Sequence, residues 1–415
     1  MTIKNLYPNQ EPSLLLNFSK SITVDPRLSF TRPSNSSYLK TNGTIGYSIS
    51  GEPRLDFNYQ SGDVGLLVEE QRTNFLNYSN NLTNTTWTSV RNQVTANAGT
   101  APNGTNTANR IVPSSGYLTH FSSQAYSSFE NGSSYTFSLF AKQQELKCLQ
   151  IHFGAGPFPN RPSVNFDLSS GAIVSIEGGA TASIEKMGNG WYRCSVTVLS
   201  SENTSSFVSV VAYPSGYLSR NKEFNTDGVS GLLVWGAQLE KGTHSTSFIE
   251  TTSAQVTRAS DEVSLVNSNF SSWFNQTEGC LVVEFDRQKL NYSQSNQNII
   301  LMDDGSSLNA IELYVSASNN ICLKVKKNNV VTVDIIGDVL PLNKTTVAFS
   351  FKGNSYKLLM KGKSPKLAVI GELPVVNRML LCADSNGITS SSTRIGSLRF
   401  YKYAASSLQL EYLIN

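Results

Sequence analysis

Paired carboxylates are the residues of this 415-residue chain that could perform acid–base chemistry. Hydrolysis of a glycosidic bond needs two carboxyl groups roughly 5–10 Å apart across a cleft. The sequence offers three pairs: Glu69 with Glu70, Glu284 with Asp286, and Asp303 with Asp304. Glu284 and Asp286 would share one face of a strand, because side chains alternate along a strand. That face is also what the solvent side of an amphipathic strand looks like, so we predict no catalytic residue.

Histidine and cysteine add little chemistry. The three histidines, His120, His152 and His244, stand in no metal-ligand spacing such as HExxH. The five cysteines lie in apolar, strand-like runs without a CxxC motif, so we predict buried, reduced thiols. Asp303 and Asp304 could offer oxygen ligands to calcium, but a β-turn explains the same residues, and both interpretations remain open. We predict no metal site and no cofactor.

Aromatic residues in loop-like segments could bind a sugar by stacking on its ring. Such a ring presents an apolar face to the sugar, and neighbouring Asn, Asp, Gln and Arg side chains can bond the hydroxyls. Trp87 follows an Asn/Thr run and could either be exposed or pack between domains. The candidate glycan-binding residues are Tyr117, Phe121, Tyr126, Tyr213, Tyr217 and Trp87.

Composition excludes several functional classes. The net charge is +3 and charged residues make up 15%, against about 25% in an average soluble protein. A charge-driven nucleic-acid binder needs a basic surplus that is missing here. No apolar run approaches the ~20 residues of a membrane helix, and the polar opening of Met1–Lys20 predicts no secretory signal. With 39% hydrophobic and 10% aromatic residues, the chain can bury a sizeable core.

The elements that must position these residues are strands. Thr, Val, Tyr and Phe favour pleated surfaces, Ser, Asn and Gly favour turns, and helical periodicity is confined to Ser406–Leu413. We therefore predict an all-β fold with two β-sandwiches. Strand-like runs separated by turn signals fill 65–250 and again 260–415. Residues 1–64 are too few for a core of their own and must pack on another domain or a partner.

Two short sequences recur. Gly65–Val68 returns as Gly231–Val234, and Thr31-Arg32 returns as Thr257-Arg258. Either the composition produces these echoes by chance, or they mark a middle module inserted between residues 1–64 and the C-terminal sandwich.

Several longer motifs resemble modules of bacteriophage virion proteins. The segments 65–78 (GLLVEEQRTNFLNY), 187–196 (MGNGWYRCSV) and 234–242 (VWGAQLEKG) resemble a carbohydrate-binding-like jelly roll of such proteins. The segment 14–31 resembles the stretch that commonly precedes it. The segments 273–279, 302–305 and 395–413 resemble the concanavalin A-like, LamG-like domain that commonly follows.

The resemblance implies a structural protein exposed on a phage particle, such as a tail fibre, receptor-binding protein, capsid decoration or head fibre. It further implies a homo-oligomer, for which trimers are common, and contacts with other virion proteins. With the residues above, it predicts a non-enzymatic protein that binds host-surface glycan, is made in the bacterial cytoplasm and is localised on the virion. The alternative is a polysaccharide-degrading tail enzyme.

Overall fold

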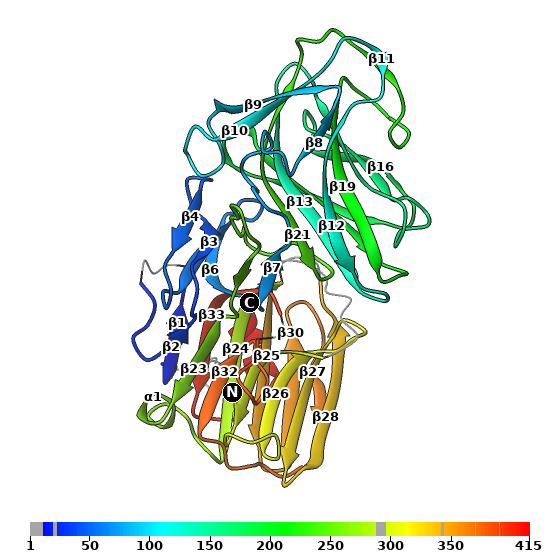
Figure 1. Ribbon diagram of the computed structural model, residues 1–415. Helices are drawn as coiled ribbons and strands as arrows, with labels where there is room; N and C mark the ends of the chain where they lie inside the picture. The colour runs from blue at the N-terminus through cyan, green and yellow to red at the C-terminus, as the bar shows by residue number, and fades with distance from the viewer. Residues whose placement is uncertain (1–10, 20–22, 288–295, 342–343, 370, 390) are drawn as a thin grey trace.

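The chain forms two β-sandwiches, one above the other in Figure 1. This is a computed structural model, and it describes residues 11–19, 23–287, 296–341, 344–369, 371–389 and 391–415. Almost every element is a strand in an antiparallel sheet, which confirms the predicted all-β fold. None of the described helices is long and apolar enough to cross a membrane.

The C-terminal sandwich contains strands from both ends of the chain. Its first sheet runs β31 (Lys366–Ala368), β30 (Ser355–Met360), β29 (Thr345–Lys352), β24 (Glu278–Arg287), β33 (Thr393–Tyr401), β6 (Asp63–Val68) and β5 (Arg54–Asn58), and β1 (Leu14–Asn17) also pairs with β33. Its second sheet runs β2 (Ser29–Thr31), β23 (Glu262–Val266), β32 (Arg378–Leu381), β25 (Gln297–Asp303), β26 (Ala310–Val315), β27 (Asn320–Lys327) and β28 (Val330–Val339). A short helix, α1 (Ser268–Ser271), follows β23.

The middle sandwich occupies the chain between β6 and β23. One sheet runs β17 (Thr181–Lys186), β18 (Tyr192–Leu199), β13 (Ser134–Gln143), β21 (Leu232–Lys241), β10 (Ala108–Pro113) and β9 (Asn92–Gly99). The other runs β16 (Ala172–Glu177), β15 (Ser163–Asp167), β14 (Cys148–Phe153), β19 (Thr204–Tyr213), β12 (Phe121–Phe129) and β8 (Thr88–Val90). The small ribbon of β11 (Gly116–Leu118) and β20 (Phe224–Thr226) lies at the far end of this sandwich (Figure 1).

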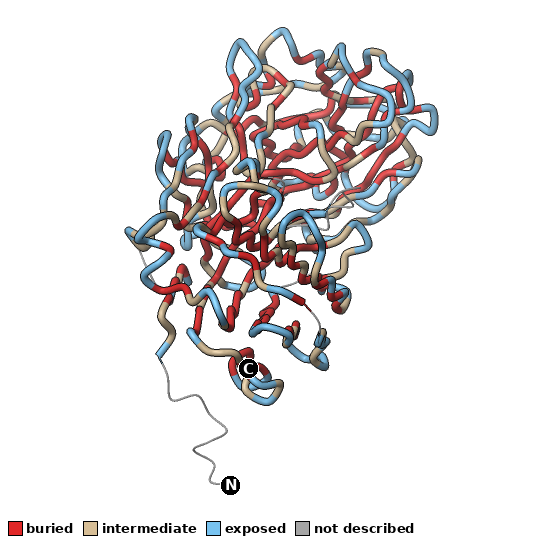
Figure 2. The backbone as a smooth tube through the Cα atoms, turned by 90° about the horizontal axis from the view of Figure 1, so that it is seen from below, coloured by how far each residue is buried: buried red, intermediate tan, exposed pale blue. Residues whose placement is uncertain are grey.

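Each sandwich has its own apolar core, which follows from the alternation of its strands. In β24, Leu281, Val283 and Phe285 face the C-terminal core. The opposite face of β24 supplies Cys280 and Val282, which pack under the terminal helix α2 (Ser407–Ile414). Ser406 caps this helix in a capping box with Gln409, so the predicted helix is confirmed. Figure 2 shows buried backbone running through both sandwiches.

The middle module begins later than the sequence suggests. We placed its start at Gly65, but β6 pairs with β33 and β5 and therefore belongs to the C-terminal sheet. The chain leaves that sheet after Val68 and re-enters the C-terminal sandwich at β23, in the other sheet. The sequence 65–68 recurs at 231–234, but the two strands that contain these segments, β6 and β21, are not neighbours. β21 pairs with β13 and β10 instead. The continuous apolar run of β6 fits either sandwich, so the sequence pattern alone does not assign it.

A hairpin from the N-terminal segment connects the two sandwiches. It consists of β3 (Ser36–Leu39) and β4 (Ile45–Ser48). Ile45 donates its backbone N–H to the carbonyl of Pro102, and the hydroxyl of Ser37 donates to the carbonyl of Phe248, both in the middle module. The same segment supplies β5 to the C-terminal sheet. Residues 36–58 therefore contact both sandwiches.

Candidate functional site: a cleft between the sandwiches

A cleft of about 430 Å³ lies where the N-terminal segment meets both sandwiches. Its size is typical of a small-molecule site. We call it the interdomain cleft. The N-terminal wall is Ser37, Tyr38, Leu39, Ile45, Asp56, Phe57, Asn58, Tyr59, Gln60, Ser61, Asp63 and Leu67. The middle module supplies Phe140, Glu185, Lys186, Met187, Arg193, Ser247 and Phe248, and the C-terminal sandwich supplies Asp286, Arg287, Lys344 and Arg394.

The N-terminal wall carries accessible aromatic rings. Tyr38 and Phe57 are half-buried, and Tyr59 is 37% exposed. Phe57 and Tyr59 meet edge to face with ring centroids 6.0 Å apart, which limits the freedom of both rings. Asn58 and Gln60, beside these rings, add amide donors and acceptors. Rings and amides in one wall are the combination that a sugar requires.

Two of the cleft carboxylates are held by one arginine. Arg394 donates from Nη1 to Asp286 Oδ2 at 2.7 Å and from Nε to Asp56 Oδ2 at 3.1 Å. Asp286 also accepts from Asn58 Nδ2 at 2.7 Å, and Asp56 accepts from the backbone N–H of Leu39 at 2.6 Å. Burial raises the pKa of Asp286 above its ordinary value, against the lowering effect of Arg394. Asp56 and Asp286 therefore already accept hydrogen bonds from groups of the protein itself.

Two further cleft arginines have no carboxylate partner. Arg287 and Arg193 are each 8% exposed, and no carboxylate of the described residues lies within 4.0 Å of their side-chain nitrogens. Arg287 donates to the amide oxygens of Asn319 and Gln297 at 2.7 and 2.6 Å. Burial lowers its pKa to about 10, so it is charged at neutral pH.

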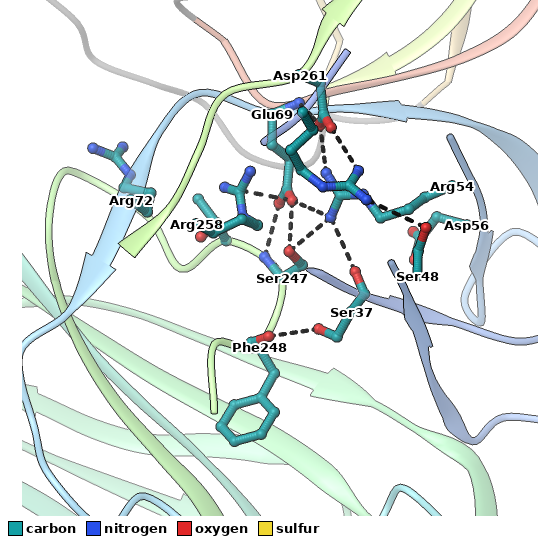
Figure 3. Close-up of polar contacts among 12 residues, drawn as sticks. Ser37, Ser48, Arg54, Asp56, Glu69, Arg72, Ser247, Phe248, Arg258 and Asp261 are labelled. Carbon is teal, nitrogen blue, oxygen red and sulfur yellow. Dashed lines mark hydrogen bonds and ion pairs between the residues drawn. The ribbon is translucent and has the colours of Figure 1, made fainter. Parts of the chain in front are cut away.

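A buried charge cluster lies next to the cleft and fixes its walls (Figure 3). We define it as Arg32, Arg54, Glu69, Arg258 and Asp261, each at most 1% exposed. Arg32 binds Asp261 at 2.9 Å, Arg54 binds Glu69 at 2.6 Å, and Arg54 also binds Asp261. Arg258 lies 3.5 Å from Glu69. Arg32 and Arg54 come from the N-terminal segment, whereas Glu69, Arg258 and Asp261 come from the two stretches of chain that connect the sandwiches. The cluster therefore joins the N-terminal segment to both connections.

The middle module is joined to this cluster through Ser247. Its backbone N–H donates to Glu69 Oε1 at 2.8 Å, and its hydroxyl donates to Glu69 Oε2 at 2.6 Å. Arg54 also donates to the carbonyl of Ser37 at 2.9 Å, in the bridging hairpin. Although burial opposes ionisation, Arg258, Arg54 and Ser247 hold the pKa of Glu69 well below its ordinary value. The cleft therefore has rigid surroundings.

The motifs that resemble phage virion modules supply residues to these contacts. Asn74 donates to the carbonyls of Ala237 and Ile249 at 3.1 and 2.9 Å, and so links the motif 65–78 to the motif 234–242. β7 (Arg72–Asn74) pairs with β22 (Val256–Arg258). The repeated Thr-Arg sequences both place their arginine, Arg32 and Arg258, in the charge cluster. Polar residues inside apolar runs were the signal that could have predicted this joint.

None of the six aromatic residues predicted from sequence lines the cleft. Tyr117 is 64% exposed on β11, and Tyr217 is 58% exposed and donates its hydroxyl to Glu177 at 2.5 Å. These two have the accessibility that stacking requires. Phe121 is half-buried beside the ring of His152, with centroids 6.4 Å apart.

Of the other three, Tyr213 and Trp87 are buried in the middle module and Tyr126 is half-buried there, which corrects the placement of Tyr126 and Tyr213 on exposed loops. Tyr213 ends β19, is 1% exposed and donates its hydroxyl to Asn165 at 2.8 Å. Trp87 is buried in the middle module's own core, so it is neither exposed nor packed between domains, and both alternatives were wrong. Tyr126 stacks on Phe75 with centroids 4.8 Å apart, and burial raises its pKa to about 12.

The other sequence candidates also find structural partners. Glu284 pairs with Lys344 at 3.4 Å and is not part of the cleft lining, whereas Asp286 is. Asp303 pairs with Arg378, and Asp304 accepts from Ser306 and Asn309, as in the turn interpretation. Among the described residues no group of three or more His, Cys, Asp or Glu is arranged to hold a metal. The five cysteines are buried and free, as predicted.

No protein-family model and no curated protein matches the sequence. Among solved structures, the chain is similar to the carbohydrate-binding module CBM40 of a Ruminococcus gnavus sialidase bound to α2,3-sialyllactose. The identity is 15%, the match covers 34% of this chain and 83% of that one, and the TM-score is 0.28. Domains LG4–5 of the mouse laminin α1 chain match at 10% identity over 71% of this chain and 92% of that one, with a TM-score of 0.26. A Trypanosoma rangeli sialidase mutant matches at 10% over 74% and 60%, with a TM-score of 0.30. Likenesses at these scores carry no functional argument, and the description of the fold rests on the strands themselves.

Proposed function

We propose that this protein is a non-enzymatic phage virion surface protein that binds host-surface glycan in the interdomain cleft. The observation that carries the binding proposal is the cleft itself. It combines accessible aromatic rings, neutral amides and a rigid frame in one volume of about 430 Å³. Tyr117 and Tyr217 are additional exposed rings on the middle module, and we keep them as a secondary contact surface.

Binding without cleavage fits the environment of the cleft carboxylates. A glycosidase needs one carboxylic acid as proton donor and a second carboxylate as base or nucleophile, both free to face the sugar. Asp56 and Asp286 instead share the guanidinium of Arg394, so both carboxylates already bond to a side chain of the protein itself. Glu284, the predicted partner of Asp286, is bound to Lys344.

The virion assignment rests on the motif resemblance described above. The compared structures do not bear on it, since none of the three is a phage protein.

Self-association belongs to the same proposal, because repeated weak sites gain roughly 10²–10⁴ in avidity when they are linked. Light scattering of the purified protein gives the number of copies, and labelling of imaged particles gives the position on head or tail.

A binding experiment tests the site. The full chain is titrated against host capsular and lipopolysaccharide oligosaccharides and followed by saturation-transfer NMR. The Tyr59→Ala variant removes the most exposed cleft ring and should weaken binding roughly two- to twelvefold, since stacked aromatic contacts contribute about 0.5–1.5 kcal/mol. Tyr412→Ala is the matched control, because it removes an equally sized ring that is 53% exposed on helix α2 and does not line the cleft. Equal losses in both variants, or none in either, would remove the cleft from the proposal.

The alternative enzymatic function has one observation in its favour: Asp286 lies in the cleft and its pKa is raised by burial. Incubation with the same glycans and assay for new reducing ends tests it. We expect no release. Release that disappears in Asp286→Asn would establish a depolymerase and overturn the non-enzymatic proposal.

A further inference from the structure

Arg287 is a buried cation that the chain itself does not neutralise. Among the residues that the structure describes, its side chain bonds to the neutral amides of Asn319 and Gln297. Every Asp and Glu of the sequence lies among the described residues, and none comes within ion-pair distance of Arg287. The neighbouring Arg394, in contrast, has two carboxylate partners.

A second cation of this kind lies in the part of the lining that the middle module supplies. Arg193 of the middle module is 8% exposed and donates to the carbonyl of Thr246 at 2.6 Å and to Ser138 Oγ at 3.0 Å. Its guanidinium lies 5.2 Å from the centroid of the Phe140 ring. It too has no carboxylate within ion-pair distance among the described residues. The cleft thus has two buried guanidinium groups without a carboxylate within 4.0 Å, one on each sandwich, although Arg193 has Glu185 as its cross-strand neighbour.

Burying a charge without a counter-ion is unfavourable, so proteins seldom do it where nothing else supplies the opposite charge. The buried charge cluster nearby shows how this chain treats structural arginines, since Arg32, Arg54 and Arg258 each have a carboxylate within 4.0 Å. Arg287 departs from that pattern, and it lies in the lining of the interdomain cleft. A ligand that brings its own negative charge would complete the site.

We propose that the interdomain cleft selects an acidic glycan and that Arg287 binds the carboxylate of a uronic or sialic acid residue. The inference rests on the proposed function, because it takes the cleft as the glycan site. A guanidinium presents a planar fork of N–H donors that matches a carboxylate in a two-point contact. The aromatic wall with Tyr59 would then hold the sugar ring, and Arg193 would add positive potential from the facing wall.

The test uses the full chain and pairs of oligosaccharides. Each acidic oligosaccharide, containing uronic or sialic acid, is compared with the same oligosaccharide after reduction of its carboxyl groups. We expect the acidic member to bind at least tenfold more tightly, and added salt to narrow the difference. Arg287→Gln should remove this preference. Arg161→Gln, which removes an equal charge from an exposed position outside the cleft, should keep it.

The outcomes separate this inference from the proposed function. Equal binding of both members overturns the acidic preference and leaves glycan binding intact, whereas binding of neither overturns both. Tighter binding of sulfated or phosphorylated oligosaccharides overturns the carboxylate assignment. Thermal unfolding provides a second readout: a melting temperature of Arg287→Gln equal to or above that of the parent supports a ligand role. A large drop, or failure to fold, shows that Arg287 serves the fold and overturns the inference.

Discussion

Glu69 illustrates how one side chain can stabilise a whole joint. It accepts from Arg54 and Ser247, lies 3.5 Å from Arg258 and is fully buried. Glu69→Gln keeps the shape but leaves buried Arg258 without a carboxylate within 4.0 Å and Arg54 with Asp261 alone. We expect the free energy of unfolding to fall by about 3–5 kcal/mol, measured by chemical denaturation.

The matched control is Glu145→Gln, which removes an exposed partner of Arg110 at 2.7 Å. Exposed ion pairs contribute only about 0–1 kcal/mol, so its stability should remain close to that of the parent. Equal losses in the two variants would show that the cluster is not the joint we describe.

His152 makes the stability of the middle module depend on pH. Burial, reinforced by the nearby Arg220, lowers its pKa to about 3 from an ordinary value of 6.5. The folded protein therefore keeps His152 neutral, while the unfolded chain takes up a proton below pH 6.5. Stability must fall as the pH drops through this window, by about 2 kcal/mol between pH 7.5 and 5.0 from this one residue. His152→Leu should remove that part of the acid sensitivity, as seen in denaturation curves at both pH values. An unchanged pH dependence would show that His152 is accessible to protons in the folded state.

At the residue scale, burial was the property that the sequence predicted least well. The position of Tyr213 before Pro214 and Gly216 suggested a loop. In the structure its ring packs in a small cluster with Leu218, and its hydroxyl finds Asn165. A buried tyrosine with a satisfied hydroxyl has the same local sequence as an exposed one, because the partner comes from a distant strand. Asp286, one of the paired carboxylates in the sequence, lines the cleft, although its strand pattern predicted a solvent-facing position.

At the scale of elements, the contact between hairpin β3–β4 and the middle module can be tested by substituting glycines of the N-terminal segment and measuring the loss of stability. Gly43 and Gly51 both have a φ of +79°. An added Cβ at Gly43 would lie 2.6 Å from Gly188 Cα, in the short turn Gly188–Gly190, whereas at Gly51 it would meet open space. The two alanine variants share the backbone strain and differ in the contact. We expect Gly43→Ala to cost about 1–3 kcal/mol more than Gly51→Ala in thermal or chemical unfolding. Equal costs would mean that the hairpin does not press on the middle module.

Individual strands were predictable because alternation is a local property. The segment 279–286 was predicted as a strand with Leu281, Val283 and Phe285 on one face, and β24 has these three in the core. The assignment of β6 and the existence of the cleft depend instead on pairing between segments far apart in the sequence. Leu66 pairs with both Leu55 and Ile395, and a single sequence contains no signal for the second partner.

At the scale of the whole molecule, residues 1–64 complete the C-terminal sandwich. Leu14, Leu16 and Phe18 belong to its core, and β1 pairs with β33. Arg32 and Arg54 neutralise Glu69 and Asp261 in the charge cluster. The middle module, in contrast, has a core made of its own residues, from Leu76 to Leu239.

Removal of residues 1–64 should therefore affect the two sandwiches unequally. The C-terminal sandwich would lose core residues and strand partners, and two carboxylates would stay buried with only Arg258 nearby. We expect calorimetry of the truncated chain to show one surviving transition, at the temperature at which the isolated segment 70–255 unfolds. Limited proteolysis should degrade 260–415 first, because an open sandwich exposes backbone to the protease. A truncated chain with the melting profile of the full chain would contradict this account, and so would a fragment 260–415 that unfolds cooperatively by itself. Either result would mean that residues 1–64 lie on the surface of a complete sandwich, and the cleft that they help to form would then lack a fixed wall.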